Sequence, residues 1–146
     1  MRITKDPEVR RQEIIDSAKA LFEKKGIRKT SMSEIAENIG VAKGLVYYYF
    51  SSKEELVREV IEDIIKGVDK KLAAMIQEPG SFYRKLGAIL DLYFNSIAQH
   101  PTLREMNPAH PDLFLLIKDR LSEMANGHAI KLIHEGLAET HDFAVG

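Results

Sequence analysis

The sequence predicts an all-α protein, and two observations lead to that prediction. Apolar residues recur three and four positions apart along most of the chain, which is the spacing of one helix face. Helix start signals made of Ser, Asp and Pro alternate with stop signals made of Gly and Pro, and they divide the chain into segments of helical length. No segment alternates convincingly with the period of two that a strand requires.

The first predicted helix begins at Asp6, which caps it, with Pro7 in the first helical position. Ile14 and Phe22 mark its apolar stripe. Gly26 follows where a helix often ends in a left-handed residue, so the helix is expected to stop there.

Two short helices follow, over about 31–39 and 43–49, joined by a tight turn at Gly40. Ser31 and Glu34 have the spacing of a capping box, which starts the first of them. Two short helices joined by a tight turn and preceded by a longer helix describe a helix-turn-helix.

The second short helix contains three consecutive tyrosines, and a helical wheel separates them. At about 100° per residue, Val46 and Phe50 point inward and Tyr48 points outward. Tyr47 and Tyr49 flank the inward direction. Flanking tyrosines can hold their hydroxyls toward phosphates, while an outward tyrosine can meet base edges in a major groove.

Three longer helices are predicted after the helix-turn-helix. The first opens with a second capping box, Ser52 with Glu55, and stops at Pro79–Gly80. The next covers 82–99, a proline-containing connector covers 100–111, and the last covers about 113–137 with a bend or break near Gly127.

The composition limits the classes of function. The chain has 146 residues, of which 45% are hydrophobic and 29% are charged, and it has no cysteine. The sequence shows neither a transmembrane segment nor a signal peptide. We therefore expect a cytoplasmic protein with no membrane partner. The five histidines lack metal-site spacing, and no phosphate-binding loop, dinucleotide fingerprint or hydrolase motif is present. We therefore expect no enzyme, no metal and no cofactor.

The charges are unevenly distributed along a chain whose net charge is only -1. Residues 24–53 carry six Lys/Arg against two Asp/Glu. A basic segment on a nearly neutral protein is typical of a nucleic-acid reader, although taken alone it is more often a solvated face.

Residues 10–57 resemble the TetR family of transcriptional regulators. The family pattern T-[TS]-x-x-x-I-A appears as TSMSEIA from Thr30, and G-V-[SA]-x-G-x-[LV]-Y-x-[HY]-F appears as GVAKGLVYYYF from Gly40. The pattern x-x-K-x-x-L follows as SSKEEL. Two residues depart from common family choices: Leu45 replaces a frequent threonine, and Tyr49 replaces a frequent histidine.

The resemblance implies a homodimer that binds a palindromic double-stranded DNA operator, usually as a repressor released by a small molecule. By the same resemblance, the residues that face bases are Ser33, Lys43, Gly44, Leu45 and Tyr48, and those that contact phosphates are Thr30, Ser31, Tyr47, Tyr49 and Lys53. A DNA-binding domain over 8–68 and a helical effector-binding and dimerisation domain over 69–146 are expected. Family members usually continue further and dimerise through their last two helices, so either the chain is truncated or residues 112–137 form the interface.

The resemblance also makes residues of the C-terminal half, Met124 among them, candidates for an effector pocket that takes an apolar or amphipathic molecule. The main candidates are Phe82, Leu86, Leu90, Tyr93, Phe94, His100, Met106, His110, Phe114 and Ile117, with Tyr93, His100 and His110 as polar orienting groups. Aromatic and aliphatic stripes at helical spacing more often form a core, and that alternative stays open. For the whole chain, a transcriptional activator or an architectural DNA-binding protein is the main alternative to a repressor.

Overall fold

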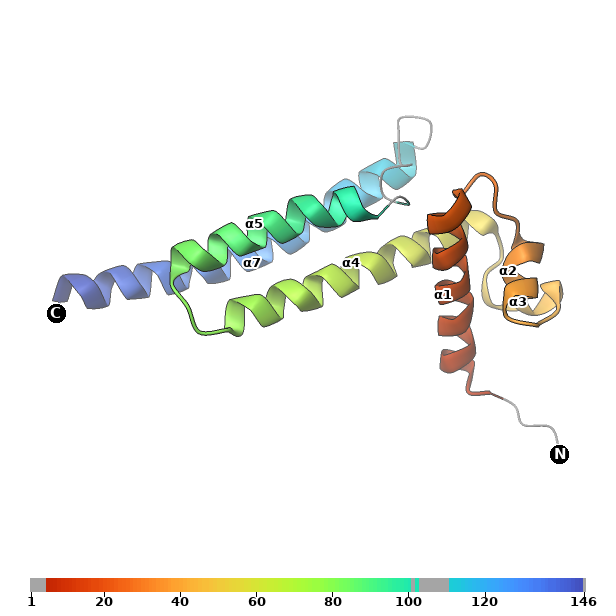
Figure 1. Cartoon of the computed structure of the whole chain (residues 1–146), viewed down its shortest axis with the longest axis horizontal. Coiled ribbons are helices and arrows are strands. Elements are labelled where there is room, and N and C mark those ends of the chain that lie inside the picture. The colour runs from red at the N-terminus through yellow and green to blue at the C-terminus, as the bar shows by residue number, and fades with distance from the viewer. Residues whose placement is uncertain (1–4, 101, 103–110, 146) are drawn as a thin grey trace. The chain divides into compact units, whose positions relative to one another are not determined.

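The computed structural model describes residues 5–100, 102 and 111–145, and the regular structure within them is helical throughout. The helices are α1 (Pro7–Lys25), α2 (Met32–Asn38), α3 (Lys43–Tyr49), α4 (Lys53–Gln77), α5 (Phe82–Gln99) and α7 (Pro111–Val145) (Figure 1). The predicted all-α class is confirmed, and the first five helices end within about two residues of their predicted bounds.

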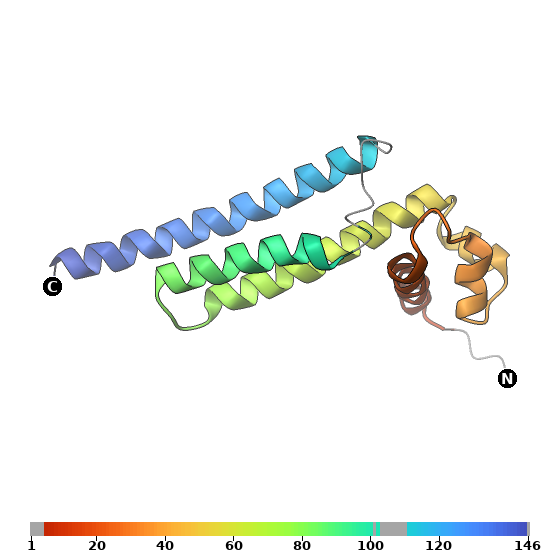
Figure 2. The ribbon, with the colours of Figure 1, turned by 45° about the horizontal axis from the view of Figure 1, so that its top comes forward.

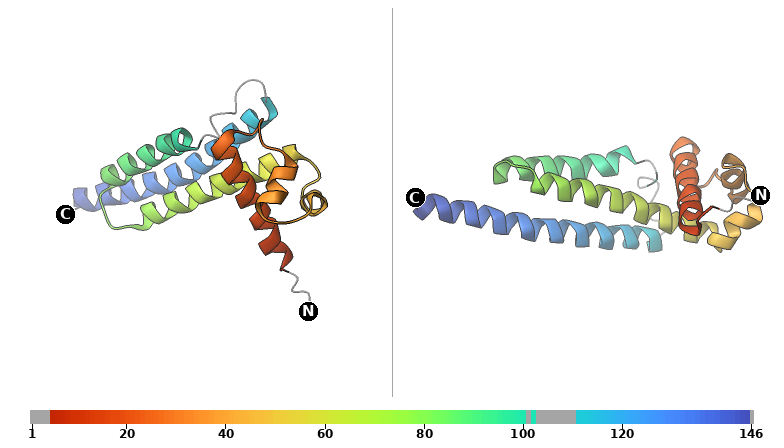
Figure 3. Two further views of the ribbon diagram at one scale, coloured as in Figure 1. Left: turned by 45° about the vertical axis from the view of Figure 1, so that its right-hand side comes forward. Right: turned by 90° about the horizontal axis from the view of Figure 1, so that it is seen from below.

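The chain divides into two compact units, and the division falls inside α4. The first unit comprises Met1–Ile64 and His100–Asn107, and the second comprises Ile65–Gln99 and Pro108–Gly146. Figure 3 shows α1, α2, α3 and the beginning of α4 gathered in the first unit. The described helices α5 and α7 belong entirely to the second.

The core of the first unit draws apolar side chains from all four of its helical segments. Burying such side chains is the main favourable contribution to folding, at roughly 1.5–3 kcal/mol for each fully buried aliphatic or aromatic residue. The side chains with 0–1% exposure are Ile14, Ala18, Phe22, Ile35, Val46, Phe50, Leu56, Val60 and Ile61.

The helix starts follow the predicted chemistry, with one difference in each capping box. The hydroxyls of Ser31 and Ser52 accept hydrogen bonds from the backbone N–H groups three residues later, both at 3.1 Å. The Glu34 carboxylate forms an ion pair with Lys25 of α1 rather than bonding back to Ser31. The Glu55 carboxylate accepts from the backbone N–H of Ser51, at 2.8 Å, instead of from Ser52.

The second unit is built from the C-terminal part of α4 with α5 and α7. In Figure 2 the three run alongside one another, and α5 and α7 have opposite directions. The Phe82 ring packs against Gly136, where an added Cβ would lie 2.7 Å from the ring. His128 Nε2 of α7 lies 2.6 Å from Asp69 Oδ1 of α4, which ties these two helices together.

The last helix corrects a prediction. α7 runs unbroken from Pro111 to Val145, whereas a bend or break near Gly127 and an end near Leu137 were expected. A glycine inside a helix costs only about 1 kcal/mol relative to alanine. Met124 and Leu132, buried on either side of Gly127, and the His128–Asp69 contact hold the helix in place across it.

α7 is apolar on two opposite faces. Its buried residues are Ile117, Met124 and Leu132. A second set is exposed by 51–62% and consists of Leu115, Ile130, Ile133 and Leu137. At about 100° per residue, the exposed set falls within an arc of about 60°, roughly opposite the buried set. We call this exposed set the outer stripe.

Candidate nucleic-acid interface

The turn between α2 and α3 is fixed by backbone hydrogen bonds around one glycine. Gly40 has φ of 67°, a left-handed conformation that residues with a Cβ rarely adopt. Its N–H donates to the Glu37 carbonyl at 3.1 Å, and the next N–H, of Val41, donates to the Ala36 carbonyl at 3.0 Å. This pair of bonds is the Schellman arrangement, and it sets the direction in which α3 leaves α2.

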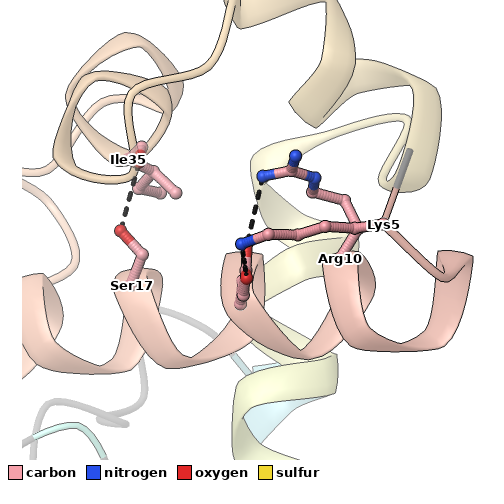
Figure 4. A network of polar contacts seen from close by, with 5 residues as sticks. Lys5, Arg10, Ser17 and Ile35 are labelled. Atoms are coloured by element: carbon pink, nitrogen blue, oxygen red, sulfur yellow. Dashed lines mark hydrogen bonds and ion pairs between the residues drawn. The ribbon is translucent and has the colours of Figure 1, made fainter. Parts of the chain in front are cut away.

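A buried polar chain attaches α2 to α1. The hydroxyl of Ser17, only 4% exposed, donates to the Ile35 carbonyl at 3.1 Å (Figure 4). It also accepts from Asn38 Nδ2 at 2.9 Å. Because the Ser17 hydroxyl both donates and accepts, the link attaches α2 to α1 without leaving this buried group unsatisfied. Sequence reasoning did not identify Ser17 or Asn38 as parts of the scaffold.

The side chains of α3 are arranged as the helical wheel predicts. Val46 and Phe50 are 0% and 1% exposed, and Tyr48 is 80% exposed. Tyr47 is 43% exposed and Tyr49 is half-buried. One short helix therefore presents an outward aromatic with a more enclosed tyrosine on each side.

Ring contacts order this aromatic group. The rings of Tyr48 and Tyr49 meet edge-to-face with centroids 5.2 Å apart. Lys43 Nζ lies 5.7 Å from the centroid of the Tyr47 ring, within the range of a cation–π contact. Gly44 of the same helix is exposed, and a Cβ added there would meet nothing within 4 Å.

The end of α3 is braced by α1 and α4. The Arg11 guanidinium lies over the Phe50 ring, 5.3 Å from its centroid, and pairs with the Glu59 carboxylate at 2.7 Å. Gln12 adds a hydrogen bond of 3.1 Å to Asp63. Lys53, the first residue of α4, is half-buried at this end of the helix-turn-helix.

The sequence profile of bacterial regulatory proteins of the tetR family matches residues 14–60, a range that contains α2, the Gly40 turn and α3. Residues 14–60 belong to the TetR family.

Known TetR-type relatives match the chain in sequence and in fold. The uncharacterized HTH-type transcriptional regulator YfiR of Bacillus subtilis is 37% identical over 93 residues, which are 62% of this chain and 44% of that protein. The HTH-type transcriptional repressor KstR2 of Mycobacterium tuberculosis is 28% identical over 91 residues, which are 62% and 46% of the two chains. A crystal structure of a TetR/AcrR-family regulator from Thermobifida fusca superposes with a TM-score of 0.70 at 29% identity, covering 90% of this chain and 72% of that one. The chain spans about half the length of the curated relatives it matches.

Most of the base- and phosphate-contact residues implied by the TetR resemblance are accessible. Ser31, Ser33, Lys43 and Gly44 are exposed, and Leu45 is half-buried. Thr30 differs from them, because its side chain is 2% exposed and its hydroxyl donates to the Gly26 carbonyl at 2.8 Å. A phosphate contact by the Thr30 hydroxyl would require that bond to break.

Two carboxylates of the first unit have lowered pKa values. The Lys5 ammonium, which bonds to Glu13 together with Arg10, holds the pKa of Glu13 below its usual value (Figure 4). The Ser51 hydroxyl and backbone N–H, which both donate to Glu55, do the same for the Glu55 pKa. The lowered pKa values show that both carboxylates are stabilised in their charged form by these bonds near the starts of α1 and α4.

The predicted effector residues are dispersed. Phe82 and Leu86 are half-buried and Ile117 is buried, whereas Leu90 and Phe94 are 47% and 66% exposed. His100 belongs to the first unit, where its Nδ1 lies 3.4 Å from Glu23 of α1. Met106 and His110 lie outside the described residues, and the side chains of Tyr93 and Phe114 lie outside those that the structure describes.

One pocket of about 420 Å³ in the second unit lies elsewhere, between α4 and α7. Its lining consists of Asp69, Glu123, Met124, Gly127, His128, Ile130, Lys131 and His134, and of these only Met124 was expected from the sequence to line a pocket. No spacing in the sequence pointed to this pocket, because Asp69 and His128 come together only through packing. Across the residues that the structure describes, no group of side chains is arranged to hold a metal ion, and no helix is both long and apolar enough to cross a membrane.

Proposed function

We propose that this TetR-family protein is a sequence-specific DNA-binding transcriptional regulator, acting as a repressor on a palindromic operator. The observation that carries the proposal is the outward face of α3, where an 80% exposed tyrosine stands beside an exposed glycine on a helix of fixed direction. Apart from its edge contact with Tyr49, the Tyr48 ring is open to solvent, so it is accessible to a partner. A helix presented in this way by a helix-turn-helix fits the major groove.

In this proposal the contacts divide into two kinds. Tyr48, Leu45 and Ser33 read base edges, where apolar contact with a thymine methyl is one of the readouts available. Tyr47, Tyr49 and Lys53 contact phosphates and set the register of α3 on the duplex. Residues 8–68 form the DNA-binding domain, and residues 69–146 form the effector and dimerisation domain.

We further propose a homodimer, because a palindromic operator needs two copies of α3 related by a two-fold axis. The outer stripe of α7 supports this, since a helix that is apolar on two opposite faces has a partner for only one of them within the described unit. A second copy of the chain would cover the other.

The pocket between α4 and α7 is our candidate effector site. Met124 gives it a buried apolar wall, Ile130 from the border of the outer stripe adds to it, and His128, Lys131 and Asp69 give it polar groups, so an amphipathic molecule of either charge suits it. Decanoate and decylamine are matched probes of opposite charge. Release of a labelled operator duplex by one of them, followed by anisotropy, would support this site, and release by neither up to the millimolar range would count against it.

The function itself is tested by selection from random DNA duplexes at near-physiological salt. We expect enrichment of an inverted repeat, whose half-site spacing gives the separation of the two α3 helices. Retention of duplexes without any enriched sequence would favour an architectural DNA-binding protein instead. Failure to bind any duplex would overturn the proposal.

Repression and activation differ in the position of the operator relative to a promoter, which no residue encodes. A reporter gene placed behind the selected operator distinguishes them, and repression is expected. The relative KstR2 is named a repressor and YfiR a transcriptional regulator, which supports regulation rather than catalysis. We propose no catalytic residue, metal or cofactor.

A further inference from the structure

The end of α1 and the turn before α2 carry a concentration of positive charge that helix packing and the contacts proposed above explain only in part. Four of the six residues from 24 to 29 are Lys or Arg, and none is acidic. The side chains of Lys24, Lys25, Arg28 and Lys29 are all exposed.

Two of these cations have ordinary structural explanations. Lys24 and Lys25 lie in the last turn of α1, where positive charge is favoured by the helix dipole. Lys25 also forms the ion pair with Glu34 of α2. Arg28 and Lys29 lie beyond the end of the helix, and within the described part of the chain no hydrogen bond or ion pair involves either of them.

The backbone that carries Arg28 and Lys29 is held in one conformation. Gly26 has φ of 91°, and its N–H donates to the Phe22 carbonyl at 2.8 Å. The buried Thr30 closes the turn from the other end, because its hydroxyl donates to the Gly26 carbonyl at 2.8 Å and its N–H donates to the Ile27 carbonyl at 3.3 Å. A cationic pair on an ordered turn loses less freedom on binding than one on a mobile loop.

The turn leads directly into the proposed interface, since Ser31 caps α2 two residues after Lys29. We propose that Arg28 and Lys29 form an additional phosphate-contacting element, and that Thr30 is a positioning residue for it rather than a phosphate contact itself. This inference rests on the proposed DNA-binding function. It adds a contact outside the helix-turn-helix and assigns Thr30 the role that its burial supports.

The test is the salt dependence of DNA binding by the double variant Arg28→Gln/Lys29→Gln. Each phosphate contact contributes about 0.9 to the slope of log Kobs against log salt concentration, so the slope should become shallower by about 1.8. The slope is measured on the selected operator and on a random-sequence duplex, and it should change equally on both because phosphates carry no sequence. The matched control is Lys70→Gln/Lys71→Gln, which removes two exposed positive charges from the part of α4 in the second unit and should change the slope little.

Each other outcome overturns some part of the inference. A slope no shallower than that of the control would remove Arg28 and Lys29 from the interface. A loss confined to the operator would make them base contacts rather than phosphate contacts. A wild-type protein that bound neither duplex would overturn the proposed function and this inference with it, whereas normal wild-type binding with an unchanged slope would overturn the inference alone.

A double-mutant cycle tests the role of Thr30. Thr30→Val keeps the shape of the side chain but removes the hydroxyl that closes the turn. If Thr30 acts through the turn, the variant should weaken DNA binding several-fold in the wild-type background and have no further effect in Arg28→Gln/Lys29→Gln. An equal effect in both backgrounds would instead indicate a direct contact between Thr30 and DNA. Thermal melting of each protein ensures that folded samples are compared.

Discussion

At the scale of single residues, α3 is the part of the molecule that its sequence predicts best. Val46 and Phe50 are buried and Tyr48 is exposed because their spacing decides their direction before any tertiary contact forms. Burial of Thr30 could not be predicted in this way. Its environment depends on how the chain turns after α1, and a threonine before a helix start is equally compatible with a surface contact.

Gly44 provides a test of how closely the α3 backbone approaches DNA. A Cβ at Gly44 has open space around it in the free protein, so Gly44→Ala should leave stability unchanged or raise it by up to about 1 kcal/mol through helix propensity. If the backbone lies against DNA, the same methyl group should weaken operator binding by tenfold or more, which corresponds to about 1.4 kcal/mol. Urea unfolding and operator titration measure the two effects separately.

The control for this variant is Gly67→Ala in α4. Gly67 is also exposed and also has nothing within 4 Å of an added Cβ, but it belongs to the second unit. It should gain the same helix propensity without any change in DNA binding. Undiminished operator affinity in Gly44→Ala would mean that the α3 backbone stays clear of the duplex.

Tyr48 and Lys53 should affect DNA binding in different ways. Tyr48→Ala removes a proposed base contact, so we expect a changed sequence preference in a repeated duplex selection and a nearly unchanged salt slope. Lys53→Ala removes a proposed phosphate contact, so binding to every duplex should weaken and the salt slope should become shallower by about 0.9. Equal effects of the two variants on all sequences would contradict this division.

At the scale of helices, the capping serines Ser31 and Ser52 predict the starts of α2 and α4 correctly. The glutamates of the two capping boxes, Glu34 and Glu55, bond to residues other than the predicted ones. Glu34 pairs with Lys25, which is distant from it until α1 and α2 pack together. Glu55 bonds to Ser51, a neighbour that the box pattern does not consider. Local patterns fix where a helix begins, but partners supplied by packing or by an adjacent residue can displace the expected bond.

The start of α4 should make stability depend on acidity. The Glu55 pKa is lowered in the folded state by the Ser51 hydrogen bonds. Its carboxylate therefore contributes stability that is fully present above the unfolded value of about 4.3 and is lost as the pH falls through the lower folded value. Glu55→Gln should be less stable than the wild type at pH 7, and the difference should shrink as the pH falls below about 4.3.

Urea unfolding at pH 7, 5, 4 and 3 measures this dependence. Glu54→Gln is the matched control, because it removes the same charge from the same helical turn without removing an acceptor of the Ser51 bonds. A constant difference between wild type and Glu55→Gln at all four pH values would show that the Ser51 contact does not depend on ionisation.

At the scale of the whole chain, the sequence predicted the class and the helix-turn-helix but not the arrangement of the second unit. The apolar residues of α7 occupy two opposite faces of the helix, and their spacing alone does not distinguish a side chain that meets α4 from one that meets solvent. Leu90 and Phe94 were expected in a pocket and are exposed, while the pocket between α4 and α7 contains polar residues that the sequence places 59 positions apart. Those contacts depend on the register between helices, which only packing determines.

The outer stripe of α7 carries the last prediction, which concerns assembly. If a second copy of the chain covers this stripe, Ile133→Lys should place a charge in the interface and shift the protein toward the monomer in sedimentation equilibrium. Because Ile133 is already 53% exposed within one chain, the helical content and the unfolding midpoint of the monomer should not fall. Affinity for an inverted repeat should drop toward that for a single half-site. Val9→Lys is the matched control, since Val9 is 52% exposed on α1 in the first unit and should leave the oligomeric state unchanged. A wild-type protein that stays monomeric, or a variant with the same dimer dissociation constant as the wild type, would remove the outer stripe from the dimer interface.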